Sequence, residues 1–452
     1  MGEKVMVAGL GKSGISAAKL LLEAGGEVLL YDGNEEIDIE NILGNFKEEY
    51  LSKISFKLGS LSKSDLTGVN LCVISPGIDL MTPFVKVVYD SKIQIWSEIE
   101  LGFAISKGNL VAITGTNGKT TTTALTGQIA KNYFDEVFTV GNIGLPYTDV
   151  ALKTTENSVT VLEVSSFQLE TIVDFKPHIS AILNITPDHL DRHHNMEEYI
   201  SIKKDITLNQ TKEDFCILNY EDEVLRKFGE SDKCPAKAIF FSSERKLEEG
   251  YYLFENAIYS KFNKEEKKIL EVKELGILGK HNYENVMAAI AISVSLKIPM
   301  DIIVKTCKEF KGVEHRIEHV ATKYGINYYN DSKGTNPDAA IKAVEAMPGP
   351  ILLIAGGYDK KANYDEWVET FKGRVKYLVL IGQTRDAISE CAKAHGFQDI
   401  MYAESLEEAV KVCASYADVG DYVLLSPACA SWGMFKNYEQ RGEVFKACVR
   451  KL

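Results

Sequence analysis

The chain has 452 residues, which is too many for one compact core and predicts two to four domains. Its formal net charge of −13, with lysine and arginine scattered along the sequence, disfavours a nucleic acid as the main partner. Eight cysteines without a C-x-x-C pair predict neither a zinc site nor a disulfide framework, and the lack of a long apolar stretch predicts a cytoplasmic protein with no membrane partner.

The first block of the chain predicts a Rossmann-like nucleotide-binding domain. Residues 5–8 form an apolar run that is typical of a buried strand, and the turn G-L-G-K-S-G follows at 9–14. A helical segment continues to about Glu23, and a second strand at 28–31 ends at Asp32. A G-x-G-x-x-G turn between strand and helix, with an acid roughly 20 residues further on, is the fingerprint of dinucleotide-binding folds.

The second block opens with the most informative motif of the chain. The apolar run 110–113 predicts a strand, the turn G-T-N-G-K-T-T occupies 115–121, and 122–130 predicts a helix. Glycines in such a turn let backbone N–H groups approach phosphates, and the helix N-terminus adds partial positive charge. We therefore predict that Lys119 contacts the β- and γ-phosphates of a nucleoside triphosphate and that the Thr120 hydroxyl ligates Mg²⁺.

Two further strands of this block end in polar side chains. A predicted buried strand ends at Glu163, and an acid at the carboxyl end of a parallel strand usually faces a ligand, so we expect a magnesium ligand there. The strand 179–184 leads into a loop that is dense in acids and bases, where His189 is the candidate to ligate metal or to orient substrate. The neighbouring His193 and His194 are expected to be solvated.

The rest of the second block is less distinctive. Lys203 and Lys204 lie on a predicted helix over 197–208, and from spacing alone such a pair is typical of a solvated helix face. The charged stretch 212–274 is interpreted as the less regular side of the domain. A further helix is predicted to follow the motif at 279–285.

The third block is predicted to be another α/β unit. Buried parallel strands are expected at 351–355, 377–381 and 422–425. Asp331 and Lys333 follow a strand-like run, and Arg316 lies upstream; these residues suit contacts to a nucleotide or an anionic substrate, with an exposed polar turn as the alternative. We therefore expect an α/β fold in three domains, at 1–97, 98–311 and 312–452.

Taken together, these segments resemble the Mur ligases, the ATP-dependent amide-forming enzymes that build the stem peptide of peptidoglycan. The motifs that carry the resemblance stand in the family's order: GTNGKTT at 115–121, LEVSSFQLE at 162–170, LNITPDHLDRH at 183–193, GKHNYENVMAA at 279–289, GVEHRIE at 312–318 and NDSKGTNPDAA at 330–340. The run over 424–445 is similar to that of the members that add D-glutamate to UDP-N-acetylmuramoyl-L-alanine. The resemblance covers essentially the whole chain.

The resemblance implies a Rossmann-like first domain that holds UDP, a central P-loop ATPase domain with a mostly parallel sheet, and a Rossmann-like α/β third domain. The positions that match the UDP-substrate side are Lys12, Ser13, Asp32, Ser75, Pro76, Gly77, Asn142, Ser165 and Gln168. Those that match the ATP side are Gly115, Thr116, Asn117, Gly118, Lys119, Thr120, Thr121, Asn282, Asn285, Arg316, Asp331 and Lys333. Those that match the D-glutamate side are Thr335, Lys360, Ser431 and Tyr438.

The resemblance also implies the chemistry. Thr120, Glu163, His189 and Lys203 match the metal positions, and Lys119, His189 and Lys203 match catalytic ones. Lys203 matches a lysine that becomes carbamylated, which would hold the second of two Mg²⁺ ions. The implied enzyme is a cytoplasmic monomer that forms an acyl phosphate and releases ADP and phosphate.

Three alternatives remain open at this point. A related ligase could add a different amino acid, although the D-N-P-x-R run of the diaminopimelate-adding relatives is missing. The first fingerprint could mark an NAD(P) dehydrogenase, but no hydride-transfer residues accompany it and the turn at 115–121 would be left unexplained. A nucleotide sensor without catalysis would not need the polar residues around Glu163 and His189.

Overall fold

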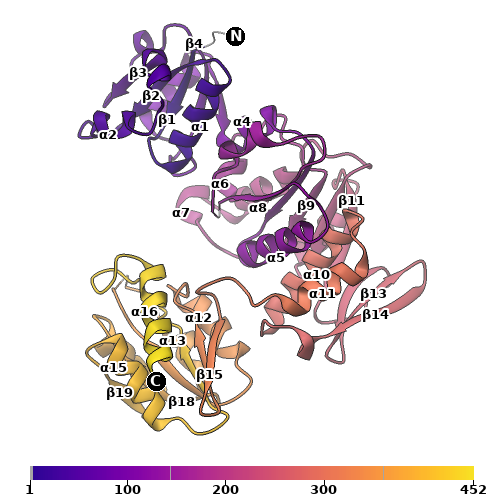
Figure 1. Ribbon diagram of the computed structural model, residues 1–452, viewed down its shortest axis with the longest axis vertical. Helices are drawn as coiled ribbons and strands as arrows, with labels where there is room; N and C mark the ends of the chain where they lie inside the picture. The colour runs from indigo at the N-terminus through magenta and orange to yellow at the C-terminus, as the bar shows by residue number, and fades with distance from the viewer. Residues whose placement is uncertain (1–3, 143, 360) are drawn as a thin grey trace. The chain divides into compact units, whose positions relative to one another are not determined.

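The computed structural model describes residues 4–142, 144–359 and 361–452 (Figure 1). The chain forms two compact units: unit 1 comprises Met1–Leu270 with Glu284–Thr306, and unit 2 comprises Glu271–Tyr283 with Cys307–Leu452. The strands of unit 1 form two sheets, and those of unit 2 form a third. The sheets and their helices confirm the predicted α/β fold, whereas the residue limits of the three domains stay predictions.

The first sheet has five parallel strands in the order β3-β2-β1-β4-β5. The bounds are β1 Lys4–Ala8, β2 Glu27–Asp32, β3 Ile54–Leu58, β4 Val69–Ile74 and β5 Gln94–Ser97. Side chains of β1 alternate between two hydrophobic clusters, with Val5 and Val7 in one and Met6 and Ala8 in the other. Both faces of the sheet are therefore covered, as the predicted Rossmann-like domain requires.

The second sheet has nine strands in the order β14-β13-β12-β11-β10-β9-β6-β8-β7. The bounds are β6 Asn109–Thr114, β7 Val137–Gly141, β8 Val159–Glu163, β9 Ile179–Ile182, β10 Phe215–Asn219, β11 Lys237–Ser242, β12 Gly250–Phe254, β13 Ala257–Phe262 and β14 Glu265–Glu271. Neighbouring strands are parallel from β7 to β12, and β12 pairs antiparallel with β13.

Residues 212–274, which the sequence predicts to be the less regular side of the domain, contain strands β10 to β14, and these strands extend the sheet. Most side chains of β14 are exposed. The charged sequence belongs to a largely solvated strand at the end of the sheet, and this pattern hides the strand from a search for buried apolar runs.

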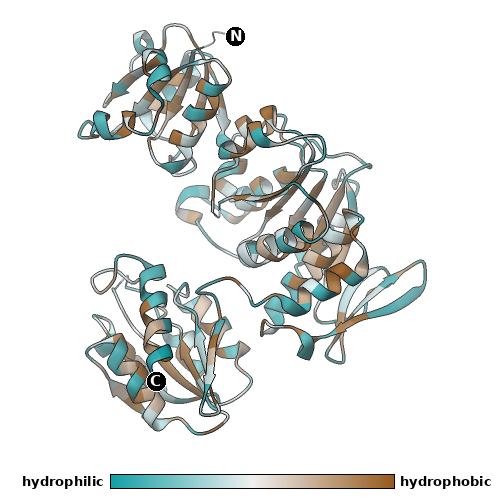
Figure 2. Ribbon diagram, viewed as in Figure 1, coloured by the Kyte–Doolittle hydropathy of each residue, from teal (hydrophilic) through white to brown (hydrophobic). Residues whose placement is uncertain are grey.

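The third sheet lies in unit 2 and has six strands in the order β15-β16-β20-β17-β18-β19. The bounds are β15 Glu318–Lys323, β16 Ile326–Asn330, β17 Ile351–Ala355, β18 Val375–Leu380, β19 Ile400–Tyr402 and β20 Tyr422–Leu425. Only β15 runs antiparallel to its neighbour among these strands. Leu353 belongs to one hydrophobic cluster and Leu352 and Ile354 to another, so both faces are buried. The inner strands of the sheet are correspondingly brown in Figure 2, whereas the edge strand β15 is pale.

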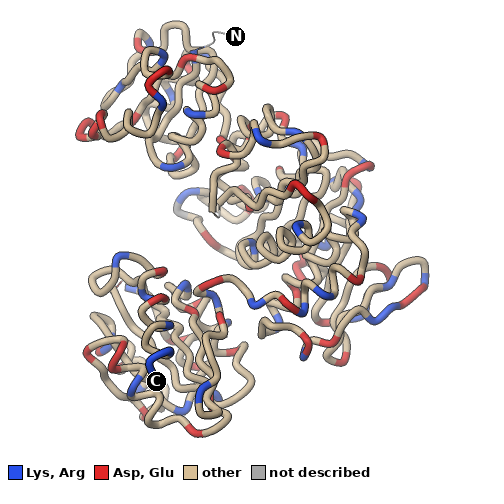
Figure 3. Tube along the Cα trace, viewed as in Figure 1, with Lys and Arg blue, Asp and Glu red and all other residues tan. Residues whose placement is uncertain are grey.

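Helices occupy most of the connections. Those in residues 1–270 are α1 Lys12–Glu23, α2 Ile39–Leu43, α3 Pro83–Asp90, α4 Glu98–Ile105, α5 Lys119–Lys131, α6 Ser166–Leu169, α7 Leu190–His193, α8 Met196–Lys204 and α9 Glu223–Gly229. The later ones are α10 Lys280–Ser295, α11 Met300–Glu309, α12 Pro337–Ala346, α13 Asp365–Glu369, α14 Arg385–Ala394, α15 Leu406–Tyr416 and α16 Tyr438–Lys451. Among the described residues no helix is both long and apolar enough to cross a membrane. Acidic and basic residues are interleaved along the whole trace in Figure 3.

Candidate active site

The second glycine-rich turn joins β6 to α5 with the backbone geometry of a phosphate-binding loop. Gly115 has φ +150° and Gly118 has φ +86°, conformations that residues with side chains rarely adopt. A Cβ atom at position 118 would lie 2.3 Å from Asn285 Oδ1, so the close approach also requires glycine. Because α5 begins at Lys119, the positive end of its dipole faces the turn.

Lys119 folds its side chain over this turn. Its Nζ donates hydrogen bonds to the carbonyl oxygens of Gly115, at 2.7 Å, and Thr116, at 2.8 Å. Both acceptors are neutral, so an anionic phosphate oxygen would be a stronger partner. The next two residues, Thr120 and Thr121, are buried at the start of α5. The turn thus presents an ammonium and a helix N-terminus where the sequence predicts the phosphates.

Hydrogen bonds fix the turn to the loop that follows β9. Asn117 N donates to Asn184 Oδ1 at 2.8 Å, and Asn184 Nδ2 donates back to the Asn117 carbonyl at 3.1 Å. Thr116 Oγ1 donates to the Thr186 carbonyl and accepts from Thr186 N, both at 3.0 Å. The loop that carries His189 is therefore held against the phosphate-binding turn.

Glu163 is a buried carboxylate with one unpaired oxygen. It ends β8, in register with Ile113 of β6, and is 2% exposed. Oε1 accepts a hydrogen bond from Asn142 Nδ2 at 2.9 Å, but Oε2 has no hydrogen-bond partner among the described residues. Carboxylate oxygens are preferred Mg²⁺ ligands, and an unpaired buried one is costly without a cation. Glu163 therefore fits the metal position predicted for it.

Lys203 is 1% exposed, so the interpretation of this residue as part of a solvated face is wrong. Its Nζ donates to the Gly115 carbonyl at 3.1 Å and lies 4.7 Å from the centre of the Tyr199 ring. Burial, with the nearby Lys119 charge, lowers the pKa of the Lys203 ammonium to about 7. Near neutral pH a substantial fraction of this side chain is therefore a neutral amine, directly behind the phosphate-binding turn.

His189 lies just before α7, in the left-handed backbone region at φ +53°. Its side chain is 51% exposed, with Nε2 3.5 Å from Asp188 Oδ2. Its ring lies 4.9 Å from that of Phe167. A non-glycine residue with positive φ is strained, and such strain often marks functional loops. The imidazole is accessible to a ligand, as a metal-binding or substrate-positioning residue requires.

The next residues of this loop contribute groups that sequence reasoning missed. Arg192 donates to both carboxylate oxygens of Glu170, at 3.2 Å from Nε and 2.6 Å from Nη2. Its Nη1 donates to the Pro76 carbonyl at 2.9 Å. Arg192 therefore connects the loop of the second sheet to the Ser75–Gly77 turn of the first sheet. The density of charge in the motif marked the loop but could not single out this side chain.

His193 is fully buried, which corrects the expectation that it is solvated; only His194 is exposed as expected. His193 Nε2 lies 2.9 Å from Ser166 Oγ, and its ring packs 5.2 Å from that of Tyr199. Burial, with the nearby Arg192 charge, lowers the pKa of this histidine. His193 thus supports the packing around Tyr199 and Lys203.

The first glycine-rich turn joins β1 to α1. A Cβ atom at Gly14 would lie 1.8 Å from the Gly9 carbonyl oxygen, which explains the need for glycine there. Asp32, at the end of β2, accepts hydrogen bonds from Leu10 N at 3.1 Å and from Asn34 N at 3.0 Å. Both oxygens of this acid therefore accept from the backbone, one from the turn itself and the other from the loop that follows β2.

The other predicted UDP-side residues lie around this turn. Ser75 Oγ donates to the Gly9 carbonyl at 3.1 Å, Ser13 and Pro76 are half-buried, and Gly77 is exposed. Lys12 Nζ donates to the carbonyl of Gly144, close in sequence to Asn142. The structure thus brings Lys12 toward the segment that follows β7 of the second sheet.

Ser165 and Gln168 form a capping box at the start of α6. Ser165 N donates to Gln168 Oε1 at 2.8 Å, and Gln168 N donates to Ser165 Oγ at 3.4 Å. The buried Gln168 also donates through Nε2 to Glu98 Oε1 at 2.6 Å. Burial raises the pKa of Glu98 to about 7. These contacts engage Gln168 in the fold, and its contact with substrate stays a prediction.

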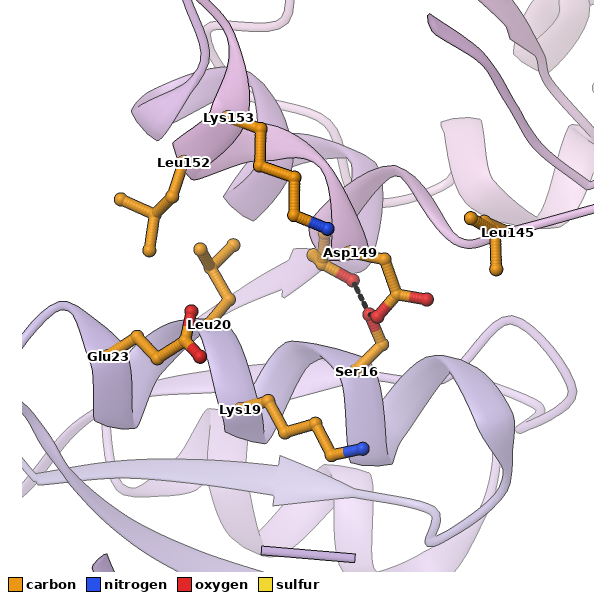
Figure 4. Close-up of a pocket in the computed structure, with 9 residues that line it drawn as sticks. Ser16, Lys19, Leu20, Glu23, Leu145, Asp149, Leu152 and Lys153 are labelled. Carbon is orange, nitrogen blue, oxygen red and sulfur yellow. Dashed lines mark hydrogen bonds between the residues drawn. The ribbon is translucent and has the colours of Figure 1, made fainter. Parts of the chain in front are cut away.

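A cavity of about 330 Å³ lies between α1 and the 3₁₀ turns Tyr147–Asp149 and Ala151–Lys153 (Figure 4). Ser16 Oγ bonds Thr148 Oγ1 at 2.6 Å and Asp149 Oδ1 at 2.5 Å at its wall. None of the predicted site residues lines it. These hydrogen bonds join α1 to the domain of the second sheet, so the cavity lies at the contact between these two domains.

In unit 2, Asp331 follows β16 and is buried. Its carboxylate accepts from Ser426 Oγ at 2.8 Å and from Ile317 N at 3.3 Å. Burial raises its pKa to about 7, although Ser426 and the Arg316 charge act in the opposite direction. Asp331 and Arg316 therefore share one electrostatic environment, as the sequence predicts for a polar site.

The remaining third-domain residues lie on the two loops that meet α16. Lys333 Nζ lies 5.7 Å from the centre of the Tyr438 ring, and Thr335 N donates to the Lys333 carbonyl at 2.9 Å. Ser431 is buried, and its carbonyl accepts from Phe435 N at 3.0 Å. Lys360 lies outside the described residues. The predicted D-glutamate contacts of this group stay predictions.

Arg441 is a buried cation that sequence reasoning did not single out. It is 1% exposed and donates from Nε to Ser332 Oγ at 3.0 Å, from Nη2 to the Ser332 carbonyl at 2.8 Å and from Nη1 to the Cys429 carbonyl at 3.1 Å. It therefore ties the loop of Lys333 to the loop of Ser431. A spacing pattern could not reveal it, because these loops lie about 100 residues apart in the chain.

The two asparagines of α10 fall in different units. Asn285, in unit 1, accepts a hydrogen bond from Thr122 Oγ1 at 3.3 Å and lies beside Gly118. Asn282, in unit 2, donates to the Leu278 carbonyl at 2.7 Å. The structure thus brings Asn285 to the phosphate-binding turn, as its predicted role on the ATP side requires.

Three family models match three successive segments of the chain. The family models that match are described as "Mur ligase MurD-like, N-terminal domain" at residues 3–97, "Mur ligase middle domain" at 113–293 and "Mur ligase, glutamate ligase domain" at 315–429. A protein of Lachnoclostridium phytofermentans named UDP-N-acetylmuramoylalanine–D-glutamate ligase is 54% identical, with 100% of this chain and 99% of the relative aligned. The protein of that name in Clostridioides difficile is 46% identical over the same shares.

Solved structures share the fold at lower identity. UDP-N-acetylmuramate-alanine ligase from Thermotoga maritima matches with a TM-score of 0.60 and 20% identity over 99% of each chain. A MurF ligase from the same organism, solved in complex with ADP, matches with a TM-score of 0.60 and 17% identity over 94% of this chain and 95% of the other.

Proposed function

The chain belongs to the Mur ligase family, and we propose that it joins D-glutamate to UDP-N-acetylmuramoyl-L-alanine in cytoplasmic peptidoglycan-precursor synthesis, with conversion of ATP to ADP and phosphate. The observation that carries the proposal is the pair of buried groups, Glu163 and Lys203, behind a glycine-lysine-threonine turn. The D-glutamate substrate follows from the names of relatives that align over the full chain. We also propose a monomer.

The reaction requires activation of a carboxylate, which is a poor acyl donor. In the proposed mechanism the alanyl carboxylate attacks the γ-phosphorus of ATP; a carboxylate O–P bond forms, the bond to the β-phosphate bridging oxygen breaks, and ADP leaves. The D-glutamate amine then attacks the acyl phosphate. The resulting tetrahedral intermediate loses a proton from nitrogen and expels inorganic phosphate, which leaves the amide. Such transfers depend mainly on positioning and charge stabilisation.

The second turn supplies the cationic groups for this transfer. Lys119 would exchange its two carbonyl partners for phosphate oxygens, which accept more strongly. The N-terminus of α5 adds its dipole along the same direction. Asn285, which accepts a hydrogen bond from Thr122 at 3.3 Å and lies beside Gly118, would support the turn while phosphate binds.

The residues around the turn fit Mg²⁺. The unpaired Oε2 of Glu163 and the Thr120 hydroxyl are oxygen ligands, and the exposed His189 would complete or orient the set. When bound, Mg²⁺ neutralises phosphate charge as it develops in the transfer. Asn142 fixes the rotamer of Glu163 through its 2.9 Å hydrogen bond, so the unpaired oxygen keeps one direction.

Lys203 is proposed to act as a carbamate. Its neutral amine attacks CO₂, a C–N bond forms, and one N–H proton leaves to solvent. The side chain then changes from a potential cation to an anion. An anion at this position would pair with a second Mg²⁺, whereas an ammonium would repel it. The low pKa of the Lys203 ammonium, caused by burial, supports this step because only the neutral amine reacts.

Unit 2 is proposed to supply the amino acid and part of the nucleotide contacts. Arg316 provides positive charge to the buried Asp331, and Lys333 provides a second cation near the Tyr438 ring. Thr335, Lys360, Ser431 and Tyr438 are the proposed D-glutamate contacts. Two carboxylates on the amino acid require cationic or hydroxyl partners, and this set contains both.

Phosphate release with UDP-N-acetylmuramoyl-L-alanine, ATP and Mg²⁺ tests the proposal. D-Glutamate, L-glutamate, meso-diaminopimelate and L-lysine are compared as acceptors. We expect release with D-glutamate only, together with one new UDP-linked product. Equal release with L-glutamate, or preference for a diamino acid, would contradict the proposed substrate while leaving the ligase chemistry intact. Nicotinamide fluorescence with NADH serves as the check for the dehydrogenase alternative, where we expect no binding.

A further inference from the structure

Three metal-ligating side chains of different chemistry meet on the outer helices of unit 2. Asp365 begins α13, Cys391 lies in the last turn of α14, and His395 follows that helix. One carboxylate oxygen, the thiol sulfur and one imidazole nitrogen all lie within 4.8 Å of one another. None of these residues belongs to the proposed active site.

The geometry centres on one oxygen. Asp365 Oδ1 lies 3.4 Å from Cys391 Sγ and 2.8 Å from His395 Nε2. His395 N donates to the Cys391 carbonyl at 3.1 Å, so the last helical turn places the sulfur and the imidazole on the same side. Tetrahedral bonds of about 2.0 Å to oxygen and nitrogen and about 2.3 Å to sulfur place an oxygen and a sulfur ligand about 3.5 Å apart and an oxygen and a nitrogen ligand about 3.3 Å apart. The oxygen–sulfur separation already agrees with this geometry, and the Asp365–His395 hydrogen bond would lengthen by about 0.5 Å around an ion.

A second carboxylate stands behind the imidazole. Glu369, four residues after Asp365 on α13, places Oε1 3.9 Å from His395 Nδ1. Histidines that bind metal through one nitrogen commonly have a carboxylate at the other, which orients the ring and raises its basicity. Helix α13 thus offers two acids at i and i+4, and α14 with its C-cap offers a thiol and an imidazole at the same spacing.

We propose that Asp365, Cys391 and His395 bind one Zn²⁺ ion or another thiophilic divalent cation, with Glu369 positioning the histidine. As the sulfur–metal bond forms, the thiol proton leaves to solvent. The thiolate and the carboxylate then balance the two positive charges of the ion, and water completes a tetrahedron. A thiolate selects soft cations, so Mg²⁺ would not compete. A search for C-x-x-C pairs cannot detect this cluster, because its three side chains are distributed over two helices.

A second acidic cluster in unit 2 provides an internal comparison. Glu314, His315 and Glu443 also gather three ligand atoms, but the Lys446 ammonium pairs with Glu314 and lies 2.6 Å from Glu443. The Lys446 ammonium therefore already neutralises the acids of that cluster, and no metal ion is needed there. Among the described ion pairs, Asp365 and Glu369 are paired with His395 and with no lysine or arginine.

The position of the cluster indicates a structural or regulatory ion. Helix α14 starts after the carboxyl end of β18 and runs for 10 residues, or about 15 Å, before His395. The loops of Asp331 and Ser431 follow the carboxyl ends of β16 and β20, strands parallel to each other in the same sheet as β18. The cluster therefore lies toward the opposite edge, where an ion would cross-link α13 to α14.

Cobalt is the probe for the test, because a cysteine-ligated Co²⁺ has a thiolate-to-metal charge-transfer band. Chelator-treated full-length protein is titrated with Co²⁺ in the presence of excess Mg²⁺ and without nucleotide or substrate. We expect saturation at one equivalent with this band and with the visible bands of tetrahedral cobalt. Cys391→Ser should lose the charge-transfer band, and Glu369→Gln should weaken binding about 10- to 100-fold. Glu366→Gln, an exposed acid on the same helix, is the matched control and should bind as the wild type does.

Alkylation of Cys391 in the wild-type protein provides a second test, which does not depend on whether a variant folds. Cys391 is half-buried, whereas the other seven cysteines are buried, so alkylation followed by peptide mass spectrometry reports on Cys391. We expect Zn²⁺ to slow its alkylation at least about tenfold in the wild type and to have little effect in His395→Gln. A wild-type protein with no charge-transfer band, a band that persists in Cys391→Ser, or equal labelling with and without Zn²⁺ overturns the proposal. These readouts need no turnover, so they stand apart from any failure of the ligase assignment.

Discussion

The two glycine-rich turns of unit 1 share a strand–turn–helix construction and differ in the charged groups behind them. At the first turn, both oxygens of Asp32 accept backbone hydrogen bonds, at 3.1 and 3.0 Å. At the second turn, Glu163 is buried with one oxygen unpaired among the described residues. The equally buried Lys203 lies against a carbonyl oxygen and an aromatic ring.

This difference separates binding from chemistry. A charged group whose hydrogen-bond partners are supplied by the fold can help to position a ligand. It contributes little to stabilising charge that develops during a reaction. A buried charge without a full set of partners costs stability and is typical of reacting centres. Substitutions at the second turn should therefore lower kcat, whereas substitutions at the first should raise KM for the UDP-linked substrate.

Lys119→Ala should have the largest effect. Loss of the only side-chain cation within the turn removes charge stabilisation from the transferred phosphoryl group, and phosphate release should fall about a thousand-fold. Lys131→Ala, at the other end of α5, is the control and should keep activity. Both variants are compared by steady-state phosphate release and by circular dichroism. Substrate-dependent turnover retained in Lys119→Ala would remove the second turn from the mechanism.

Lys203→Ala should come next, with a loss on the order of a hundred-fold that short carboxylic acids partly restore. The added acid would occupy the space of the carbamate and return its negative charge. Lys204→Ala, the neighbouring half-buried lysine, should retain activity and show no response to acetate. Full activity of Lys203→Ala without any additive would exclude the carbamate.

The pH dependence of the carbamate should follow the amine. Below pH 7 the Lys203 side chain is an ammonium and cannot react with CO₂, and above it the neutral form dominates, because burial lowers the pKa to about 7. With ¹³C-bicarbonate at fixed total carbonate, the carbamate signal in the NMR spectrum should therefore rise with pH through about 7 and then level off. A signal that first appears near the usual lysine pKa of 10.5 would contradict the assignment.

Lys12→Ala should have the smallest effect of this series. It removes a cation at the first turn and its contact with the Gly144 carbonyl, so KM for the UDP-linked substrate should rise about tenfold while kcat stays within about twofold. Lys19→Ala, which lines the cavity of Figure 4, is the control and should leave both parameters unchanged. A fall in kcat for Lys12→Ala would contradict the assignment of binding to the first turn and of chemistry to the second.

Local sequence patterns predicted those elements of the fold whose backbone geometry depends on neighbouring residues in the chain. The buried strands and the two turns were recognisable because apolar runs and glycine spacing report backbone geometry directly, as at β8 and β17. Strand β14 was missed because an exposed, charged strand has no such pattern.

The sequence predicted the residues expected to contact the ligands, but not the residues that position them. Glu163 was marked by its position at the end of a strand, but the burial of Lys203 depends on Tyr199 and on a turn about 90 residues away. Arg192, His193 and Arg441 act through distant partners, so no spacing in the sequence could reveal them. The same reason hid the cluster of Asp365, Cys391 and His395.

Isotope transfer tests the central claim, that the second turn activates a carboxylate by phosphorylation, most directly. The substrate UDP-N-acetylmuramoyl-L-alanine is labelled with ¹⁸O in its alanyl carboxylate and turned over with ATP, Mg²⁺ and D-glutamate. Expulsion of phosphate from an acyl phosphate carries one labelled oxygen away, so the account predicts one ¹⁸O atom in the inorganic phosphate for each amide formed. Phosphate that contains no label while the amide accumulates would contradict it.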